Sequence, residues 1–324
     1  MVEQNGVSAS PPGAGWERDL LERLAFAALD EQRKARRWGI FFKLLFALWL
    51  LLALILMLYE ADGLGGKAMA GRYTALVDLE GIIEPDSPAG ADSVISGLRA
   101  AFEDGSAAGV IIRANSPGGS PVQSAYINDE IHRLRKQHPK TPVYAVIGDV
   151  CASGCYYAVV AADKIYADPS SIVGSIGVLM NGFGFVDTLK KLGVERRLLT
   201  AGEHKAILDP FSPTSAFDRR HAQNMLDQIH KQFIKRVRTG RGDNLKETQE
   251  LFSGLFWTGE DALNLGLIDA FGSAGYVARE VIGAEDIVDF TFRENFFDRF
   301  ARRVGSAMVN SLRLQLWSPT PNLN

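Results

Sequence analysis

The stretch Asp149-Val-Cys-Ala-Ser-Gly-Cys-Tyr-Tyr-Ala158 follows a short apolar run at Val143–Ile147 and passes into a second apolar segment. This order predicts a buried strand, a turn of small residues, and a helix over Gly154–Ala162. The turn places Ser153 between two small neighbours, where a substrate carbonyl could approach its hydroxyl. The dipole at the start of the helix favours negative charge there. Ser153 is therefore a candidate nucleophile, and the alternative is an ordinary helix N-cap.

Working outward from this turn, short apolar strands alternate with helices, which predicts an α/β domain built from crossover units. Gly109–Arg113 is short and continuously apolar and Val143–Ile147 is similar, as expected for a sheet buried on both faces, whereas Tyr73–Leu79 alternates. The predicted strands are Tyr73–Leu79, Gly109–Arg113, Val143–Ile147, Lys164–Ala167 and Ile172–Leu179. The predicted helices are Ser93–Glu103, Val122–Gln137, Gly154–Ala162, 215–239, 247–254 and Asp261–Leu265.

Composition excludes several classes of function. The chain has 324 residues and a net charge of -3, so bulk charge gives no reason to expect a nucleic-acid partner. It contains no Walker loop and no GxGxxG fingerprint, so ATP and dinucleotide use are not indicated. Its two cysteines, Cys151 and Cys155, flank Ser153, and we expect two small buried residues rather than a disulfide or a metal site.

An apolar run from Trp38 to Tyr59 is interrupted only by Lys43 and is about 33 Å long as a helix, enough to cross a bilayer core. Basic residues precede it and Glu60 follows it, so the positive-inside rule predicts a cytoplasmic N-terminus and a domain on the outer side. A cleaved signal peptide is the rival interpretation, disfavoured by the long N-terminal extension. The predicted organisation is a cytoplasmic segment, an anchor, a linker, a globular domain and a helical tail, at residues 1–37, 38–59, 60–71, 72–289 and 290–324.

A second motif, Asn115-Ser-Pro-Gly-Gly119, follows a predicted strand. Two glycines there would let backbone N–H groups point at a ligand without obstruction from side chains. Such donors can stabilise the oxyanion of a tetrahedral intermediate. Taken alone, the motif is a plain Pro-Gly turn, and only its pairing with Ser153 favours an oxyanion hole.

The general base is harder to identify from residues alone. His132, His138, His221 and His230 fall on predicted helices or their ends and are expected at the surface. His204 neighbours Lys205 in a loop. A lysine acts as a base only where burial or nearby positive charge favours its neutral form, and by spacing alone Lys205 is a surface residue.

Five segments together resemble the signal peptide peptidase A (SppA) family of Ser-Lys serine proteases, over residues 72–275. They are Asn115-Ser-Pro-Gly-Gly-Ser120, Ala152-Ser-Gly-Cys-Tyr-Tyr-Ala158, Ile172-Val-Gly-Ser-Ile-Gly-Val178, Lys205-Ala-Ile-Leu-Asp-Pro-Phe-Ser212 and Trp257-Thr-Gly-Glu-Asp-Ala-Leu-Asn-Leu-Gly-Leu-Ile-Asp269. The resemblance implies a Clp-protease/crotonase-like α/β domain, here preceded by one transmembrane helix.

The same resemblance implies Ser153 as nucleophile and Lys205 as general base. Backbone N–H groups of Gly118 or Gly119, with that of Ser153 or Gly154, would form the oxyanion hole. A strand carrying the substrate groove would bind extended peptides by β-addition. Its residues are Ile176, Gly177, Val178 and Leu179.

The activity implied by the resemblance is degradation of cleaved signal peptides and other apolar peptides at the outer face of the bacterial cytoplasmic membrane. It also implies a ring-shaped homo-oligomer and no metal or nucleotide. The alternatives are a protease for one specific membrane protein, a crotonase-type acyl-CoA enzyme, and a non-catalytic peptide-binding scaffold. The anchor and the outward orientation disfavour the acyl-CoA enzyme, because CoA is cytosolic. The tail, in which Phe292, Phe296, Phe300 and Val304 recur, is a candidate core, docking or membrane-surface helix.

Overall fold

The computed structural model describes residues 16–63 and 71–293. The chain divides into two compact units, residues 1–68 and residues 69–324. Residues 1–15 of the predicted cytoplasmic segment, most of the predicted linker and the tail beyond Arg293 lie outside the described residues.

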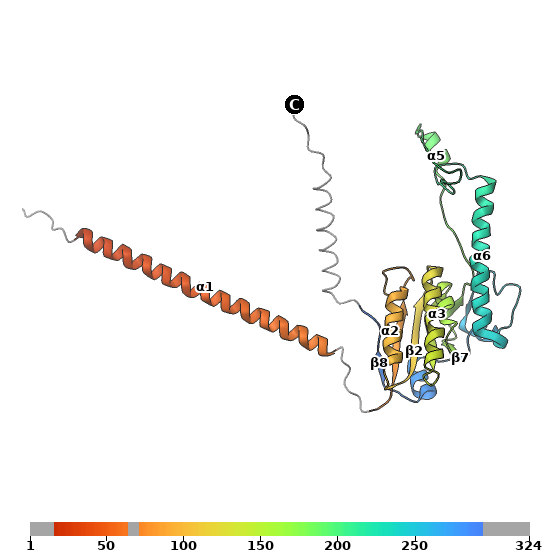
Figure 1. Ribbon diagram of the computed structural model, residues 1–324, viewed down its shortest axis with the longest axis horizontal. Coiled ribbons are helices and arrows are strands. Elements are labelled where there is room, and N and C mark those ends of the chain that lie inside the picture. Colours follow the sequence, from red (N-terminus) through yellow and green to blue (C-terminus); the bar gives the residue numbers. More distant parts are fainter. Residues whose placement is uncertain (1–15, 64–70, 294–324) are drawn as a thin grey trace, which may run out of the picture. The chain divides into compact units, whose positions relative to one another are not determined.

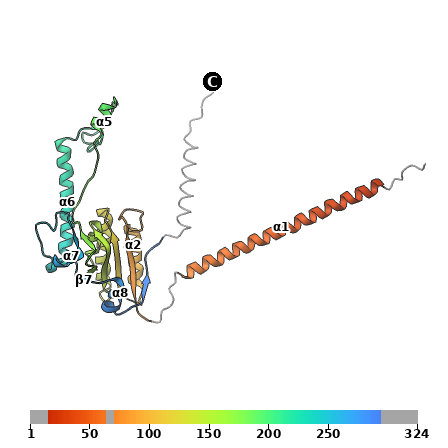
Figure 2. The same ribbon diagram turned by 180° about the vertical axis from the view of Figure 1, so that it is seen from behind.

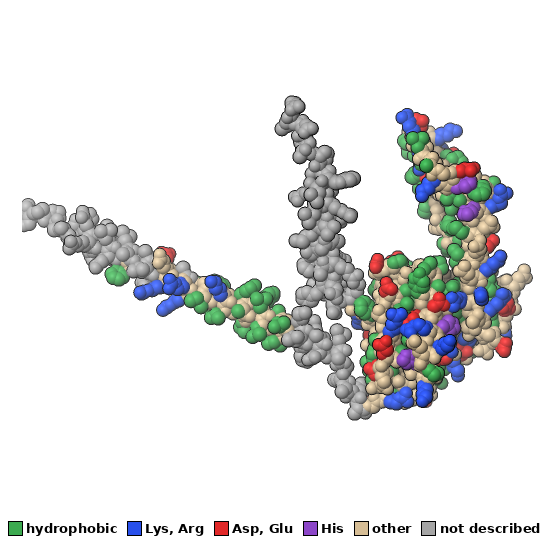
Figure 3. Space-filling view, viewed as in Figure 1, with side chains coloured by type: hydrophobic (Ala, Val, Ile, Leu, Met, Phe, Trp, Pro, Cys, Tyr) green, Lys and Arg blue, Asp and Glu red, His purple; other side chains and the backbone are tan. Residues whose placement is uncertain are grey.

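The described part of the first unit is a single continuous helix, α1 (Trp16–Gly63). The later part of the predicted cytoplasmic segment, the predicted anchor and the first residues of the predicted linker therefore form one helix. Within it, Glu31–Ile55 is long and apolar enough to cross a membrane. Lys and Arg side chains gather on α1 just before the apolar run (Figure 3). This is the candidate anchor that the sequence predicts, judged by length and composition.

The second unit is an α/β domain, which confirms the predicted fold class. Its sheet has the strand order β6-β5-β3-β2-β1-β8, with β4 pairing to β3 and β7. All pairs are parallel except the antiparallel pair β5–β6. The strands are β1 (Tyr73–Glu80), β2 (Ala107–Ser116), β3 (Val143–Ala152), β4 (Lys164–Ala167), β5 (Ile172–Gly174), β6 (Phe256–Thr258), β7 (Ala270–Phe271) and β8 (Ile287–Asp289).

Helices cover both faces of this sheet, which explains why its strands are almost continuously apolar. α2 and α3 cover one face (Figure 1), where the larger core cluster lies. α8 and η2 lie over the other face (Figure 2), where Val277 and Ala278 pack on Leu76, Ile111 and Val146. The helices are α2 (Ala91–Glu103), α3 (Pro121–Gln137), α4 (Gly154–Val159), α5 (Val186–Lys191), α6 (Ala216–Arg241), η1 (Gly242–Asn244), α7 (Gly259–Asn264), α8 (Ala274–Tyr276) and the π-helical η2 (Val277–Ile282).

Two predicted elements differ from the structure. Residues 247–254, predicted as a helix, form only turns. The strand predicted over Ile172–Leu179 ends at Gly174, because Ser175 has a φ of +50° and cannot continue a strand. Both differences lie near the one antiparallel strand pair of the sheet.

The C-terminal end of α6 is anchored in the core by a buried ion pair. Arg241 is 3% exposed and donates to both carboxylate oxygens of Asp269 at 2.8 and 2.9 Å. The same guanidinium donates to the Gly266 carbonyl, and Asp269 also accepts the N–H of Ile165. The other end of α6 carries residues 178–215, called here the arm, which extend from the sheet with α5 at their outer part (Figures 1 and 2).

Candidate active site

Ser153 occupies a sharp elbow between β3 and α4. Its φ is 52° and its ψ is -121°, a combination that non-glycine residues rarely adopt. Such strained positions are concentrated at functional sites, because the surrounding structure must enforce them. The side chain is half-buried, and the neighbours Ala152 and Gly154 leave it accessible. The elbow therefore presents the Ser153 hydroxyl at the carboxyl end of a central parallel strand.

The next helix is held in place from two sides. The amide of Asn128, fully buried on α3, donates to the carbonyl of Tyr157 at 2.8 Å. The hydroxyl of Tyr156 donates to the carbonyl of Leu267 at 2.7 Å, and burial raises the pKa of that phenol. α4 is consequently a rigid support for the residue that precedes it.

The glycine turn predicted as an oxyanion hole lies directly against this elbow. Gly118 has a φ of +100°, and a Cβ there would be 2.7 Å from the Ala152 carbonyl oxygen and 2.9 Å from the Ser153 Cβ. A Cβ on Gly154 would be 3.1 Å from the Gly119 nitrogen. The backbones of the three glycines thus meet beside Ser153, which only residues without side chains allow.

The hydrogen bonds distinguish among the candidate donors. The N–H of Ser153 donates to the Gly174 carbonyl at 2.8 Å, so it belongs to the sheet and is not available to a substrate. The N–H of Gly118 donates to the Ser116 hydroxyl at 3.1 Å. Gly154 is the first residue of α4, whose leading N–H groups have no partner within the helix. Of the alternatives Ser153 and Gly154, the geometry favours Gly154.

The predicted groove residues start beside the elbow and leave the sheet. β5 pairs with β3 so that Val173 lies opposite Cys151 and Gly174 opposite Ala152. Beyond this point Ile176 is buried, Gly177 and Val178 are half-buried, and Leu179 is 82% exposed. The four residues form no strand in this structure, so the predicted groove strand is wrong for a single copy of the chain. They do run outward from the candidate nucleophile.

Three of the predicted surface histidines, His132, His138 and His230, are half-buried instead. The Nε2 of His230, on α6, lies 3.0 Å from the carbonyl oxygen of Ile176 and so fixes the start of the groove segment. His132 is half-buried, and burial together with the charges of Arg135 and Arg236 lowers its pKa. Helical position alone could not reveal the His230 contact, because it joins residues 54 apart in the chain.

The structure does not bring Lys205 to Ser153 within one copy of the chain. Lys205 is exposed and belongs to the arm, which lies at the end of α6 away from the sheet (Figures 1 and 2). Local contacts shape the arm: Phe185 stacks on Phe211 with ring centroids 5.5 Å apart, and Arg196 pairs with Asp209. His204, the alternative base, stacks on Phe217 in the same region.

The cysteines beside Ser153 are buried as predicted, but the prediction that they form no disulfide is wrong. Cys151 is the second-last residue of β3 and Cys155 lies in the first turn of α4, and a disulfide joins them across the elbow. Both residues are 0% exposed. The elbow brings together two side chains that neither a regular strand nor sequence spacing would pair.

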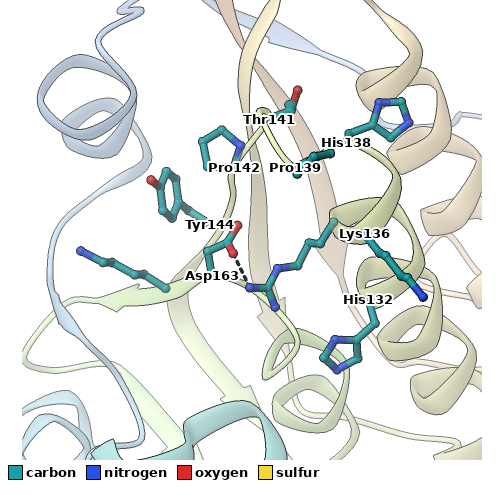
Figure 4. A pocket seen from close by; sticks show the side chains of 10 residues that line it. His132, Lys136, His138, Pro139, Thr141, Pro142, Tyr144 and Asp163 are labelled. Carbon is teal, nitrogen blue, oxygen red and sulfur yellow. Dashed lines mark hydrogen bonds and ion pairs between the residues drawn. The ribbon is translucent and has the colours of Figure 1, made fainter.

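A cavity of about 490 Å³ lies at the other end of the sheet. It is lined by residues at the start of β3 and β4 and the end of α3, including Tyr144, Lys164 and His138. Figure 4 shows Asp163 in its wall, paired with Arg135, while Lys136 points away from the pair. None of the candidate catalytic residues lines it, so it is separate from the elbow.

Comparison with known proteins relates the site to a family. The sequence model described as peptidase family S49 matches residues 135–286, which include Ser153 and Lys205. A putative protease of Methanocaldococcus jannaschii is 32% identical over 198 residues, 60% of this chain and 63% of that protein. Protease 4 of Haemophilus influenzae is 36% identical over 203 residues, 61% of this chain and 32% of that protein.

A third relative has a different name. A protein of Brucella abortus named Na(+)/H(+) antiporter NhaA is 48% identical over 186 residues, 57% of this chain but only 25% of that protein. The chain thus spans between a quarter and just under two thirds of the length of the curated relatives described here, and the Brucella abortus protein is about four times as long as the matched region. The elements that the family match covers are those that build the Ser153 elbow, α4 and the arm. Residues 135–286 of the chain thus match peptidase family S49, and the chain is similar to proteins named protease 4 and putative signal peptide peptidase SppA.

Proposed function

We propose that the protein is a membrane-anchored serine endopeptidase that degrades cleaved signal peptides and other apolar peptides. The observation that carries this proposal is the strained Ser153 elbow, packed against three glycine backbones at the end of a parallel sheet. A serine needs an accessible hydroxyl, oxyanion donors and a base to act as a nucleophile. The elbow supplies the first two, and the match to a peptidase family supports the reaction class.

In the proposed mechanism the Ser153 Oγ attacks the scissile carbonyl carbon while a lysine amine accepts the serine proton. The tetrahedral oxyanion receives hydrogen bonds from the glycine backbones, with the N–H of Gly154 the best-placed donor. Collapse of the intermediate breaks the C–N bond, and the lysine returns the proton to the leaving amine. The neutral lysine amine then activates a water molecule, which attacks the ester and releases the acyl group from Ser153.

We propose that the lysine is Lys205 of a neighbouring copy in a ring-shaped homo-oligomer. The arm that carries Lys205 exposes large apolar side chains, among them Leu199 (97% exposed) and Phe183 (74%). Exposed apolar surface of this kind is typical of an interaction site. Burial of the arm against a second copy would favour the neutral amine that a general base requires.

The anchor and its basic flank support a location at the bacterial cytoplasmic membrane, with a single span, a cytoplasmic N-terminus and a catalytic domain on the outer (periplasmic) side. Arg33, Lys34, Arg36 and Arg37 precede the apolar run of α1, as the positive-inside rule requires for this orientation. A domain held there would meet apolar peptides as they leave the bilayer. The lipid bilayer and apolar peptides are thus the proposed partners, and no nucleic acid is expected.

The test is hydrolysis of a fluorogenic apolar peptide by the detergent-solubilised full chain, comparing wild type with Ser153→Ala and Lys205→Ala. Both substitutions should reduce the rate to background without changing the unfolding transition, because the two groups act as one unit. His204→Ala is the matched control and should remain active. Full activity of Ser153→Ala would overturn the proposal, and full activity of Lys205→Ala with a dead His204→Ala would make the histidine the base.

Mixing the two inactive variants tests where the lysine comes from. If a site combines Ser153 of one copy with Lys205 of the next, random co-assembly of equal amounts should restore about a quarter of the wild-type rate. Mixing Lys205→Ala with the double variant Ser153→Ala/Lys205→Ala should restore none. Absence of any recovery in well-mixed assemblies would show that each copy supplies its own base.

A further inference from the structure

The Cys151–Cys155 disulfide surrounds the candidate nucleophile symmetrically. One sulfur comes from the residue two before Ser153 and the other from the residue two after it. These are the only cysteines of the chain, and neither is free. The proposed reaction does not use this bond, since the elbow, the glycine turn and the lysine supply its chemistry. The bond therefore needs its own explanation.

The conformation of Ser153 indicates what the bond does. Five residues in extended conformation would place the first and last Cα atoms about 13 Å apart, whereas Cys151 and Cys155 have Cα atoms 5.2 Å apart. A disulfide tolerates only a narrow range of such distances, roughly 4.4–6.8 Å. It consequently restricts the chain between the cysteines to tight turns. The strained φ and ψ of Ser153 are one way to make that turn.

The other restraints on the elbow act on single groups. The N–H of Ser153 donates to Gly174 and its carbonyl accepts the N–H of Tyr157 at 3.0 Å. These two bonds fix the backbone on either side of the Cα atom. The disulfide adds a covalent link between the strand that leads into the elbow and the helix that leads out of it. Because both cysteines are completely buried, the link is also held rigidly by the core.

We propose that this disulfide is a positioning element for the nucleophile, which holds the Ser153 hydroxyl in its attacking geometry. The proposal rests on the proposed peptidase function. The closed loop is short, so constraint of the unfolded chain is at the low end for a disulfide, and the greater effect falls on local geometry. A disulfide persists in an oxidising compartment, which agrees with the outward orientation proposed for this domain.

The experiment compares the oxidised full chain in detergent micelles with the same protein after reduction by dithiothreitol. Reduction breaks the S–S bond and leaves two thiols, while two electrons and two protons pass from the dithiol, which becomes a cyclic disulfide. Complete conversion is verified by alkylating the free thiols and measuring the mass. The double variant Cys151→Ala/Cys155→Ala also lacks the disulfide, and its activity must not change on addition of dithiothreitol.

The expected result is a fall in kcat of about 10- to 100-fold in both cases, with KM and the circular dichroism spectrum unchanged. A covalent fluorophosphonate probe of the serine should label the reduced protein more slowly by a similar factor, and reoxidation should restore both rates. Where the double variant fails to fold, the reduced wild type decides the question.

An unchanged kcat in fully reduced, folded protein would overturn the positioning role while leaving the peptidase function intact. Oxidised wild type that shows no hydrolysis above Ser153→Ala would overturn the proposed function, and this proposal with it. A fall in activity that parallels loss of the folded state would show that the bond serves only stability.

Discussion

A methyl group added to Gly118 would enter the backbone that carries the nucleophile. The new Cβ would lie 2.7 Å from the Ala152 carbonyl oxygen, 2.7 Å from the Gly154 nitrogen and 2.9 Å from the Ser153 Cβ. Real Cβ atoms do not approach backbone atoms so closely, so the elbow must move. Gly81 is the matched control, because its φ of +90° resembles the +100° of Gly118 but no atom lies within 4 Å of its ideal Cβ.

Both substitutions lower the free energy of unfolding through the positive φ, and only Gly118→Ala lowers it further through a steric clash. An alanine at positive φ costs roughly 1–3 kcal/mol, and this applies to both Gly81→Ala and Gly118→Ala. Forcing an extra methyl group into a packed site costs about 1–3 kcal/mol more, and this applies only to Gly118. We therefore expect Gly118→Ala to lose more stability than Gly81→Ala by that second amount. A displacement of Ser153 by about 1 Å would also reduce kcat roughly 100-fold.

Urea unfolding of the two full-length variants in detergent micelles measures the first difference, and hydrolysis of the fluorogenic peptide measures the second. Gly81→Ala should retain wild-type kcat despite its lower stability. The reasoning is refuted if Gly118→Ala matches Gly81→Ala in both stability and kcat. Equal kcat with unequal stability would mean that the glycine turn supports the fold without positioning the nucleophile.

The remaining predictions concern charges in the scaffold. Asp269→Ala leaves the Arg241 guanidinium buried without its partner and should cost about 3–5 kcal/mol in urea unfolding, whereas Glu247→Ala, which breaks an exposed pair, should cost less than about 1 kcal/mol. Glu130 accepts hydrogen bonds from Arg133 and Arg99, which hold its pKa at about 2 instead of the ordinary 4.5. Because the pKa of Glu130 is lower in the folded state, its contribution to the free energy of unfolding is complete above pH 4.5 and is lost as the pH falls through about 2. Glu130→Gln should therefore lose less stability than the wild type over this pH range. Identical acid-unfolding profiles of the two proteins would contradict this role of the Glu130 ion pairs.

Local patterns were sufficient for the central strands. Lys164–Ala167 is β4 as predicted, and β1 extends the predicted Tyr73–Leu79 by one residue. These strands are buried on both faces, so hydrophobicity alone locates them. β2 and β3 run farther than predicted, to Ser116 and Ala152. Their polar ends lack the apolar signal, yet they remain in the sheet because their backbones still pair with neighbours.

Predictions failed where a distant segment decides the conformation. The apolar run after Ile172 reads as one strand, but its antiparallel partner β6 pairs only with residues up to Gly174. From there the N–H of Ser175 donates to the Leu255 carbonyl and the chain turns away. No property of residues 175–179 predicts this bond, because the partner is 80 residues away in the chain.

The disulfide was missed for a related reason. Residues four apart lie on one face of a helix and on one face of a strand, at separations that differ widely. The elbow at Ser153 places the Cα atoms of Cys151 and Cys155 5.2 Å apart, and that elbow needs a positive φ at a serine. A spacing argument that treats the cysteines apart from the serine between them cannot recover their pairing.

The two proposed catalytic residues differ in how the surrounding structure holds them. Ser153 is held by the sheet, by α4 and by the glycine turn, all of which are complete within one copy of the chain. Lys205 lies on an exposed arm whose apolar side chains are not buried by its own domain. If Lys205 of a second copy is the base, as proposed, a lone copy would possess a formed nucleophile elbow without that base, and it would be inactive. Activity should consequently depend on protein concentration through the assembly equilibrium, which would keep the serine inactive in any copy that has not yet met a partner.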